Sequence, residues 1–343
     1  MKRLLNTLFV LSEDAYLKLD GENVVVHKGG DVAGRYPLHT LESILCFSYA
    51  GASPGLMGAC AERGVQLSFL TPNGRYLASA CGEMRGNVLL RKEQYRRSDS
   101  PAASCRIARN MVLGKVYNCR WVLERATRDH PQRVNVARLK QASGLLAKAL
   151  PAIETMEQLD LLRGWEGEAA QRYFDVLGEL VLQNERVFRF EGRSRRPPCD
   201  PLNALLSFAY SMLARDCASA LSSAGLDPYV GFLHRDRPGR ASLALDLMEE
   251  LRPLMGDRFV LTLVNNRVIK PNDFARGEGG AVLLNESGRK TFFAAWQERK
   301  REEIEHPYLG EKLAWGLVPS VQALLLARHL RGDLDQYPPF LWK

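Results

Sequence analysis

The segment LLRKEQYRRSDSPAASCRIARNMVLGKVYNCRWVLERAT, residues 89–127, contains the change of hydrophobic period that decides the fold. From Val88 onward, apolar residues recur at spacings of three and four, which is the period of an amphipathic helix. The boundary between two kinds of structure therefore falls near residues 82–98. Helices are expected at 101–127, 133–149, 165–185, 201–222, 242–252, 286–304 and 309–330, with longer loops at 186–200 and 264–285.

The residues before this segment favour strands. They contain short runs rich in β-branched and aromatic residues, and the stretches between these runs carry the residues of hairpin turns. Strands are expected at 7–11, 15–19, 24–27, 66–70 and 75–80, with turns at 20–23 and 71–74 and a short helix at 53–64 that ends at Gly64. The sequence thus predicts an α+β fold in which a β-rich region precedes a helical one.

Composition indicates a soluble globular protein with a polyanionic partner. The 343 residues are enough for about two domains. Lys and Arg number 47 against 39 Asp and Glu, and the net charge of +8 favours a partner such as nucleic acid. No apolar run reaches the roughly 18 residues of a membrane helix. The seven cysteines are scattered and odd in number, which favours reduced thiols in a cytoplasm over a structural zinc site.

A histidine and two carboxylates stand close together in GFLHRDRPGRASLALDLMEELRP, residues 231–253. His234 lies in a basic loop rich in glycine and proline, and a helix is expected to follow. Asp246 and Glu249 are three residues apart on that helix, so both face one target, and Glu250 shares their stripe. The alternative is a surface helix with solvated acids and an ordinary loop histidine.

A further carboxylate is placed where another backbone approaches closely. In LLRGWEGEAAQRYFDVLGEL, residues 161–180, two glycines flank Glu166 near the start of an expected helix. The alternative is that Glu166 merely favours the helix dipole in a first turn, and Glu168 fits that interpretation equally well. Spacing alone leaves both interpretations open.

A cluster of arginines precedes another helix in RSRRPPCDPLNALLSFAYSML, residues 193–213. Arg193, Arg195 and Arg196 suit the binding of phosphates, while the alternative is a solvated basic loop stiffened by prolines. Side chains able to cap the N-termini of expected helices are Asp200, followed by Pro201, and Ser242.

A glutamate, an imidazole and a further carboxylate form a ligand set for a hard or borderline cation. No cysteine lies in residues 161–180 or 231–253, which carry these ligands, so a thiolate site is not expected. Mg²⁺ or Mn²⁺ fits the set, and one imidazole among oxygen ligands favours Mn²⁺.

Three stretches, GWEGEAAQRYF, RRPPCDPLNALLSFAYSML and GFLHRDRPGRASLALDLMEELRP, together resemble the CRISPR-associated integrase family Cas1. The resemblance implies a β-sandwich-like N-terminal domain at 1–85 that mediates dimerisation, a linker at 86–98 and an all-α catalytic domain at 99–343. The ending DQYPPFLWK and the chain length are similar to the form found with type I-C systems.

The resemblance also assigns roles to single residues. It implies that Glu166, His234 and Glu249 are metal ligands and that Asp246 is an acid close to the metal, so all four are expected to be catalytic. The family position of Glu249 is aspartate in some members. Arginines expected to hold the DNA backbone are Arg163, Arg195, Arg196 and Arg235.

The implied activity is metal-dependent cleavage and joining of DNA. A 3′ hydroxyl of spacer DNA would attack a phosphodiester at the CRISPR repeat, and water in its place would make the same site an endonuclease. The implied partners are double-stranded DNA, a second copy of the chain as a homodimer, and the small protein Cas2. Two other functions are weighed, namely a metal-independent architectural DNA-binding protein and an unrelated metal-dependent phosphodiesterase acting on RNA or small nucleotides.

Overall fold

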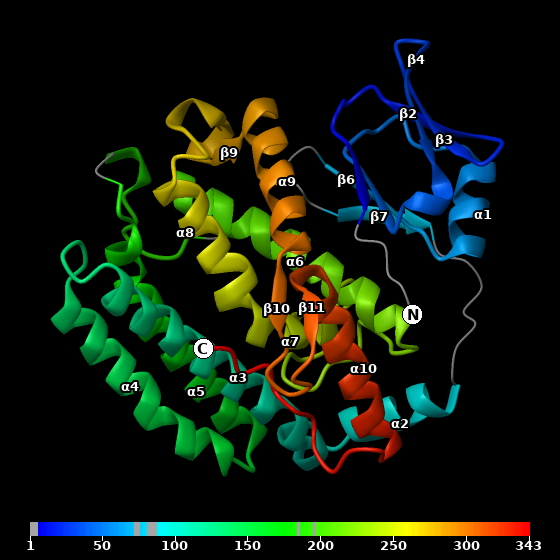
Figure 1. Cartoon of the computed structure of the whole chain (residues 1–343). Coiled ribbons are helices and arrows are strands. Elements are labelled where there is room, and N and C mark those ends of the chain that lie inside the picture. The colour runs from blue at the N-terminus through cyan, green and yellow to red at the C-terminus, as the bar shows by residue number, and fades with distance from the viewer. Residues whose placement is uncertain (1–5, 72–75, 81–87, 184–185, 195–196) are drawn as a thin grey trace. The chain divides into compact units, whose positions relative to one another are not determined.

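The computed structural model describes residues 6–71, 76–80, 88–183, 186–194 and 197–343. The chain divides into two compact units. The first comprises Met1–Gly86, Leu284–Glu302 and Trp315–Leu317, and the second comprises Asn87–Leu283, Glu303–Ala314 and Val318–Lys343. The strands drawn in blue in Figure 1 belong to the first unit, and the green and yellow helices belong to the second.

The first unit is built on two sheets and one short helix. Its described strands are β1 (Thr7–Val10), β2 (Tyr16–Asp20), β3 (Asn23–Lys28), β4 (Asp31–Pro37), β5 (Ser43–Cys46), β6 (Gln66–Leu70) and β7 (Tyr76–Ala80). One sheet has the order β1-β5-β6-β7, with only the β6–β7 pair antiparallel, and the other is the antiparallel set β2-β3-β4. Helix α1 (Pro54–Arg63) connects β5 to β6.

The predicted local signals of the first unit are largely confirmed. The β2–β3 hairpin forms with Asp20 opposite Asn23, and α1 ends at Gly64, whose φ of 69° suits glycine. Strands β4 and β5 were not predicted, because β4 (DVAGRYP) contains glycine and proline and lacks a clear apolar alternation. The predicted turn at 71–74 falls mostly on residues outside the described ranges.

Both sheets and α1 contribute to one apolar core. Its members are Val10, Ala15, Leu17, Val24, Val26, Leu38, Ile44, Cys46, Ala52, Leu56, Cys60, Val65 and Leu67. Helix α9 (Glu286–Arg301) also belongs to this unit: the ring of Phe293 stacks on Phe9 at 4.2 Å and lies 5.1 Å from Phe47. The sequence placed this helix with the helical half, because its apolar period carries no information about its packing partner.

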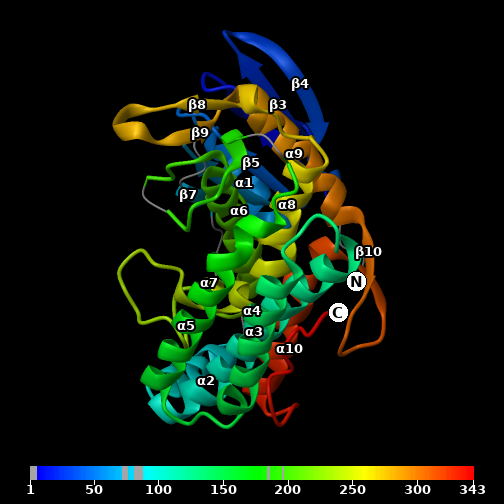
Figure 2. The ribbon, with the colours of Figure 1, turned by 90° about the vertical axis from the view of Figure 1, so that its left-hand side faces the viewer.

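The second unit is mainly helical. Its long helices are α2 (Val88–Ser98), α3 (Pro101–Asp129), α4 (Val136–Glu154), α5 (Leu159–Leu177), α6 (Pro201–Ser223), α7 (Ser242–Leu251), α8 (Arg258–Asn265) and α10 (Val318–Arg331). A π-helical turn (Arg252–Asp257) joins α7 to α8. Helix α3 packs against α4, α5 and α7, and the two views agree that α3 and α4 lie side by side (Figures 1 and 2).

Short elements complete the chain. The 3₁₀ turns are η1 (Leu38–Thr40), η2 (Gly178–Leu180), η3 (Arg186–Phe188), η5 (Pro271–Asp273), η6 (Glu278–Gly280) and η7 (Trp315–Leu317). Two antiparallel pairs are β8 (Phe274–Arg276) with β9 (Val282–Leu284) and β10 (Glu303–Glu305) with β11 (Lys312–Ala314). The segment expected to be all helical therefore also contains these two hairpins.

Several helices differ from the sequence expectation, and α8 was not predicted. Helix α5 begins at Leu159, six residues before the predicted start, because the glycines beside Glu166 do not interrupt it. The close approach of another backbone expected at these glycines is wrong, since a Cβ at Gly164 or Gly167 would meet no atom within 4 Å. Residues 88–98, expected mostly as linker, form α2. The predicted helix at 309–330 begins only at Val318, because residues 312–314 pair with β10 instead.

The six described cysteines are free thiols, and five of them are buried. Across the described part of the chain, no helix combines the length and apolarity needed to cross a bilayer.

Candidate active site

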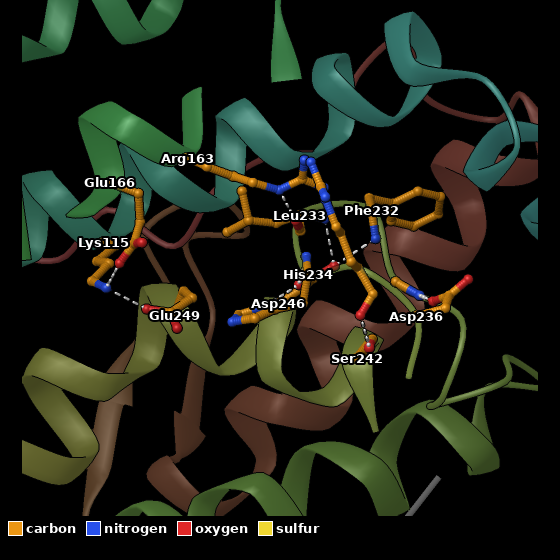
Figure 3. A network of polar contacts seen from close by, with 12 residues as sticks. Lys115, Arg163, Glu166, Phe232, Leu233, His234, Asp236, Ser242, Asp246 and Glu249 are labelled. Atoms are coloured by element: carbon orange, nitrogen blue, oxygen red, sulfur yellow. Dashed lines mark hydrogen bonds and ion pairs between the residues drawn. The ribbon is translucent and has the colours of Figure 1, made fainter. Parts of the chain in front are cut away.

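Three helices of the second unit bring charged side chains to one point. Lys115 on α3 lies between Glu166 on α5 and Glu249 on α7, and both carboxylates point at its ammonium (Figure 3). The Lys115 Nζ contacts Glu166 Oε1 and lies 2.6 Å from Glu249 Oε2. The side chains of Lys115 and Glu249 are 4% and 3% exposed, whereas that of Glu166 is 24% exposed. The cluster is therefore reached from solvent on the Glu166 side.

Opposite charges in this cluster stabilise the ionised forms of Glu249 and Lys115. The Arg252 guanidinium lies 3.0 Å from Glu249 Oε1, so Glu249 meets a cation at each oxygen. Burial raises the pKa of the Glu249 carboxyl, but Arg252, Lys115 and His234 outweigh burial and hold that pKa below its usual range. Burial lowers the pKa of Lys115, but Glu249 and Glu166 outweigh burial and raise it. Both side chains are thus charged at neutral pH.

Asp246 organises the loop that carries His234. Its Oδ2 accepts hydrogen bonds from the backbone N–H of Phe232 at 2.6 Å and of Leu233 at 2.8 Å. Its Oδ1 accepts from the His234 N–H at 2.9 Å and lies 2.6 Å from His234 Nδ1. Gly231 permits this approach, since a Cβ there would lie 2.8 Å from Asp246 Oδ2.

This contact decides which nitrogen of His234 is available. Because an ionised carboxylate only accepts hydrogen bonds, Nδ1 carries the hydrogen and donates it to Asp246. In the neutral imidazole, the lone pair is then on Nε2. A carboxylate that orients a histidine in this way is the usual outer partner of a metal-binding imidazole.

Two of the arginines predicted to hold DNA lie beside this loop. Arg163 Nε donates to the Leu233 carbonyl at 2.7 Å, and its guanidinium also meets Asp160 at 2.6 Å. Arg235 is 71% exposed and lies 3.2 Å from the same carboxylate. Arg163 thus supports the His234 loop as well as lining its edge. The other two predicted arginines, Arg195 and Arg196, fall outside the described residues.

The structure rejects the surface-helix interpretation of α7. Asp246, Glu249 and Glu250 are 0%, 2% and 0% exposed, so none of these acids is solvated. Glu250 does not share the face of the other two acids, because it contacts Tyr337, which lies six residues before the end of the chain. The predicted N-cap is also wrong: Ala241 precedes the helix, and Ser242, its first residue, donates to the Arg235 carbonyl at 3.2 Å.

The helix-dipole interpretation of Glu166 is wrong as well. Because α5 begins at Leu159, Glu166 lies in its interior and Asp160 is the acid of the first turn. Glu168, which fitted that interpretation equally well, pairs with Arg172 and is 49% exposed. Glu166 therefore differs from Glu168 by facing the cluster.

The arginine stretch before α6 is partly structural. Arg193 donates to Asn203 Oδ1 at 2.7 Å and to Ser207 Oγ at 3.0 Å, so it is not a freely solvated side chain. Asp200 accepts from the Asn203 N–H at 2.8 Å, and the predicted cap is confirmed.

The residues suit a divalent cation in donor type. Nowhere in the described ranges do three His, Cys, Asp or Glu side chains form a cluster ready to hold a metal. The carboxylates of Glu166 and Glu249 nevertheless both contact the Lys115 ammonium, so they converge on one positive charge. The Nε2 atom of His234, which does not face Asp246, adds a nitrogen donor. Two oxygens and one imidazole match Mg²⁺ or Mn²⁺. Binding there requires the Lys115 ammonium to give up at least one carboxylate.

Sequence reasoning missed Lys115 and Arg252. The signal for Lys115 is a charge on a buried helix face, because Val112 and Cys119, three residues before and four after, are buried apolar residues of α3. A lysine there needs buried carboxylates nearby. The signal for Arg252 is its spacing, because it lies three residues after Glu249 within the helix expected at 242–252.

Comparison with known proteins identifies close relatives. A sequence profile described as CRISPR associated protein Cas1 matches residues 8–298. A protein named CRISPR-associated endonuclease Cas1 2, from Rhodospirillum rubrum, is 52% identical over 347 residues, and the match covers 100% of both chains.

Solved structures share the fold at lower identity. A casposase bound to integration product has a TM-score of 0.84 and 22% identity, with 98% of this chain and 93% of that chain covered. A Cas6-RT-Cas1--Cas2 complex gives a TM-score of 0.81 and 22% identity, covering 100% of this chain and 36% of that chain. The predicted arrangement, a β-rich region followed by a helical one, is confirmed.

Proposed function

This chain belongs to the Cas1 family of CRISPR-associated proteins, and from that premise we propose that it is a metal-dependent DNA endonuclease and integrase. The observation that carries the proposal is the convergence of Glu166 and Glu249 on one buried cation beside a histidine oriented by Asp246. The name of the relative from Rhodospirillum rubrum supports the nuclease activity. The casposase, which was solved with an integration product, supports strand joining.

The side chains divide the work as follows. Glu166 and Glu249 would hold Mg²⁺ or Mn²⁺ through oxygen and His234 through Nε2, while Asp246 keeps that nitrogen aimed. The bound cation would neutralise charge that develops on the attacked phosphate. In joining, the oxygen of a spacer 3′ hydroxyl forms a bond to phosphorus and gives up its proton. The bond from phosphorus to the 3′ oxygen of the strand cut at the repeat boundary breaks, and that oxygen takes up a proton and leaves as a hydroxyl. With water as the attacking group, the products are those of an endonuclease.

Partners and assembly complete the proposal. We propose that the chain forms a homodimer through residues 1–85. We also propose a complex with Cas2, because one of the similar structures is a Cas6-RT-Cas1--Cas2 complex. The ending DQYPPFLWK suggests the type I-C subtype. The cytoplasmic location expected from the free thiols is part of the same proposal. Light scattering tests the dimer, which is excluded if the full chain and the 1–85 fragment are both monomeric.

The two other functions make different predictions. A metal-independent architectural protein would bind DNA without cutting or joining it, and it would have no need for two glutamates that converge on one buried cation. A phosphodiesterase for RNA or small nucleotides would act on those substrates and not join DNA ends. Comparing branched DNA with single-stranded RNA as substrates separates both from the integrase.

DNA binding should depend steeply on salt. An open cavity of about 930 Å³ beside α2 and α3 is lined by four arginines and three acids, and the guanidinium groups suit the phosphates of a duplex. The arginines are Arg96, Arg97, Arg106 and Arg109, and the acids are Glu93, Asp333 and Asp335. Because each phosphate that the protein neutralises releases counterions, the double variant Arg96→Glu, Arg106→Glu should weaken binding across sequences. The salt slope should become shallower by about 0.9 for each phosphate that is no longer neutralised.

A control for this measurement lies on the same helix α3. Arg128→Glu reverses a 67% exposed arginine that pairs with Asp129. It should leave the slope unchanged. Affinity that stays flat between low and physiological salt would remove the electrostatic account of DNA binding.

Lys115→Met should strengthen Mn²⁺ binding. The ammonium and the metal compete for the same two carboxylates, so removing the charge while keeping an unbranched side chain favours the metal, by at least about tenfold, or about 1.4 kcal/mol. Calorimetric titration measures this directly. Lys140→Met is the matched control, because Lys140 pairs with Glu124 away from the site. Weaker Mn²⁺ binding in Lys115→Met would show instead that the lysine is needed to hold the carboxylates together.

A further inference from the structure

A second buried carboxylate stands behind the active site and has no part in it. Glu250 follows Glu249 on α7, so the two side chains leave the helix about 100° apart. Glu250 Oε1 accepts from the Tyr337 hydroxyl and from Gln322 Nε2 at 2.9 Å, and its Oε2 accepts from the Phe340 N–H at 2.8 Å. Glu250 and these three partners are all 0% exposed. The buried carboxyl is therefore met by three donors from the C-terminal part of the chain.

Helix α3 fixes the same C-terminal residues from another side. Asn118 Nδ2 donates to the Glu250 carbonyl and to the Phe340 carbonyl, each at 2.7 Å, and its Oδ1 accepts from the Trp342 N–H at 3.0 Å. Asn110 Nδ2 donates to the Tyr337 carbonyl at 2.6 Å. One asparagine thus ties α7 and the C-terminal segment to α3.

The two helices meet almost backbone to backbone at this place. Gly114 on α3 has no side chain, and a Cβ there would lie 2.8 Å from the Cβ of Glu250. Gly114 precedes Lys115, so the point of closest approach is directly beside the residue that contacts Glu166 and Glu249. A shift of α7 at Glu250 therefore displaces Glu249 relative to Lys115.

A buried histidine fixes the orientation of Gln322. His306, at the end of β10, accepts at Nδ1 from the Tyr308 and Leu309 N–H groups, each at 3.3 Å. Nε2 must then carry the hydrogen and donate to Gln322 Oε1, 3.1 Å away. This leaves the Gln322 amide nitrogen aimed at Glu250. The hydrogen-bond chain runs unbroken from the β10–β11 hairpin to α7.

We propose that residues 337–342, here called the C-terminal strap, position the active site by fixing the rotation of α7. The inference rests on the proposed function and deepens it, since α7 carries both Asp246 and Glu249. Tyr337 and Asn118 are positioning residues: they touch neither DNA nor the atoms that would hold the metal. Catalytic groups must be held within about 0.5 Å of their working geometry, so a small rotation of α7 is enough to matter.

Two variants test the strap. Tyr337→Phe removes one hydroxyl from Glu250 without leaving a cavity, and Asn118→Ala removes the tie between α7 and the strap. Both should bind Mn²⁺ about 10- to 100-fold more weakly, the range seen when outer partners of metal ligands are lost. Both should also lower kcat for strand joining while leaving the KM for DNA and the affinity for duplex unchanged. A change confined to folding would not produce that split.

Tyr308→Phe is the matched control, because Tyr308 is 50% exposed on the hairpin next to His306. It should match the parent protein in Mn²⁺ affinity and in kcat, the two quantities that the strap is proposed to set. If Tyr337→Phe is folded and equals the parent in Mn²⁺ affinity and kcat, the strap has no positioning role, whatever Asn118→Ala does. If the parent itself neither binds Mn²⁺ nor joins DNA, the proposed function fails before the strap is tested.

Discussion

Glu166→Gln, His234→Ala and Glu249→Gln should each abolish strand cleavage and joining while duplex binding survives. Each change removes one donor from the set that would hold the cation. Metal stabilisation of the attacked phosphate is worth several kcal/mol, and each 1.4 kcal/mol is about tenfold in rate, so we expect a loss of about a thousandfold or more. The DNA-binding arginines are untouched by these changes, so affinity for duplex should stay near that of the parent.

The assay combines the protein, Cas2, a short duplex with free 3′ ends, a repeat-bearing plasmid and Mn²⁺, and it follows joined products. Circular dichroism must first show that each variant is folded, because Glu249 also neutralises Lys115 and Arg252. Glu168→Gln is the matched control, since Glu168 is on the same helix and faces solvent. A His234→Ala protein that cleaves and joins DNA like the parent would remove the proposed site.

The outline of the fold follows from local signals in the sequence. The change of period near Val88, the Asp20–Asn23 turn and the glycine after α1 are each set by neighbouring residues, and all three are confirmed. The places where prediction failed depend on distant partners. β11 pairs with β10 where a helix was expected. Helix α9 belongs to the first unit because Phe293 stacks on Phe9, which lies near the other end of the chain.

The candidate site shows the same division. Spacing on a helix predicted that Asp246 and Glu249 face one target, but Asp246 contacts the His234 loop while Glu249 contacts Lys115 and Arg252. Resemblance supplied Glu166 and His234. Spacing gave the wrong face for Glu250, because a helical wheel gives the direction of a side chain but not the residues that it contacts. The partners of Glu250 are Gln322, Tyr337 and Phe340, which come from a distant segment of the chain. Lys115 was missed for the same reason, since its two carboxylates are on other helices.

Asp246→Ala should destabilise the protein strongly, which distinguishes Asp246 from a simple metal ligand. The buried carboxylate accepts three backbone N–H groups from Phe232, Leu233 and His234. Each buried N–H left without an acceptor costs about 1–3 kcal/mol, so a loss of roughly 3 kcal/mol or more in the free energy of unfolding is expected. Mn²⁺ affinity should fall too, because His234 loses the partner that orients its ring.

Urea denaturation and calorimetric titration of the same variant separate the two roles of Asp246. Asp236→Ala is the control, because Asp236 is exposed on the same loop and has one long contact of 3.5 Å, from the Gly231 N–H. If Asp246→Ala is as stable as Asp236→Ala yet no longer binds Mn²⁺, then Asp246 is itself a ligand. Normal Mn²⁺ binding by Glu249→Gln in the same series would then reverse the two assignments. Loss of stability together with weakened Mn²⁺ binding identifies Asp246 as the anchor of the His234 loop, because only an anchor couples folding of residues 232–234 to the orientation of the imidazole.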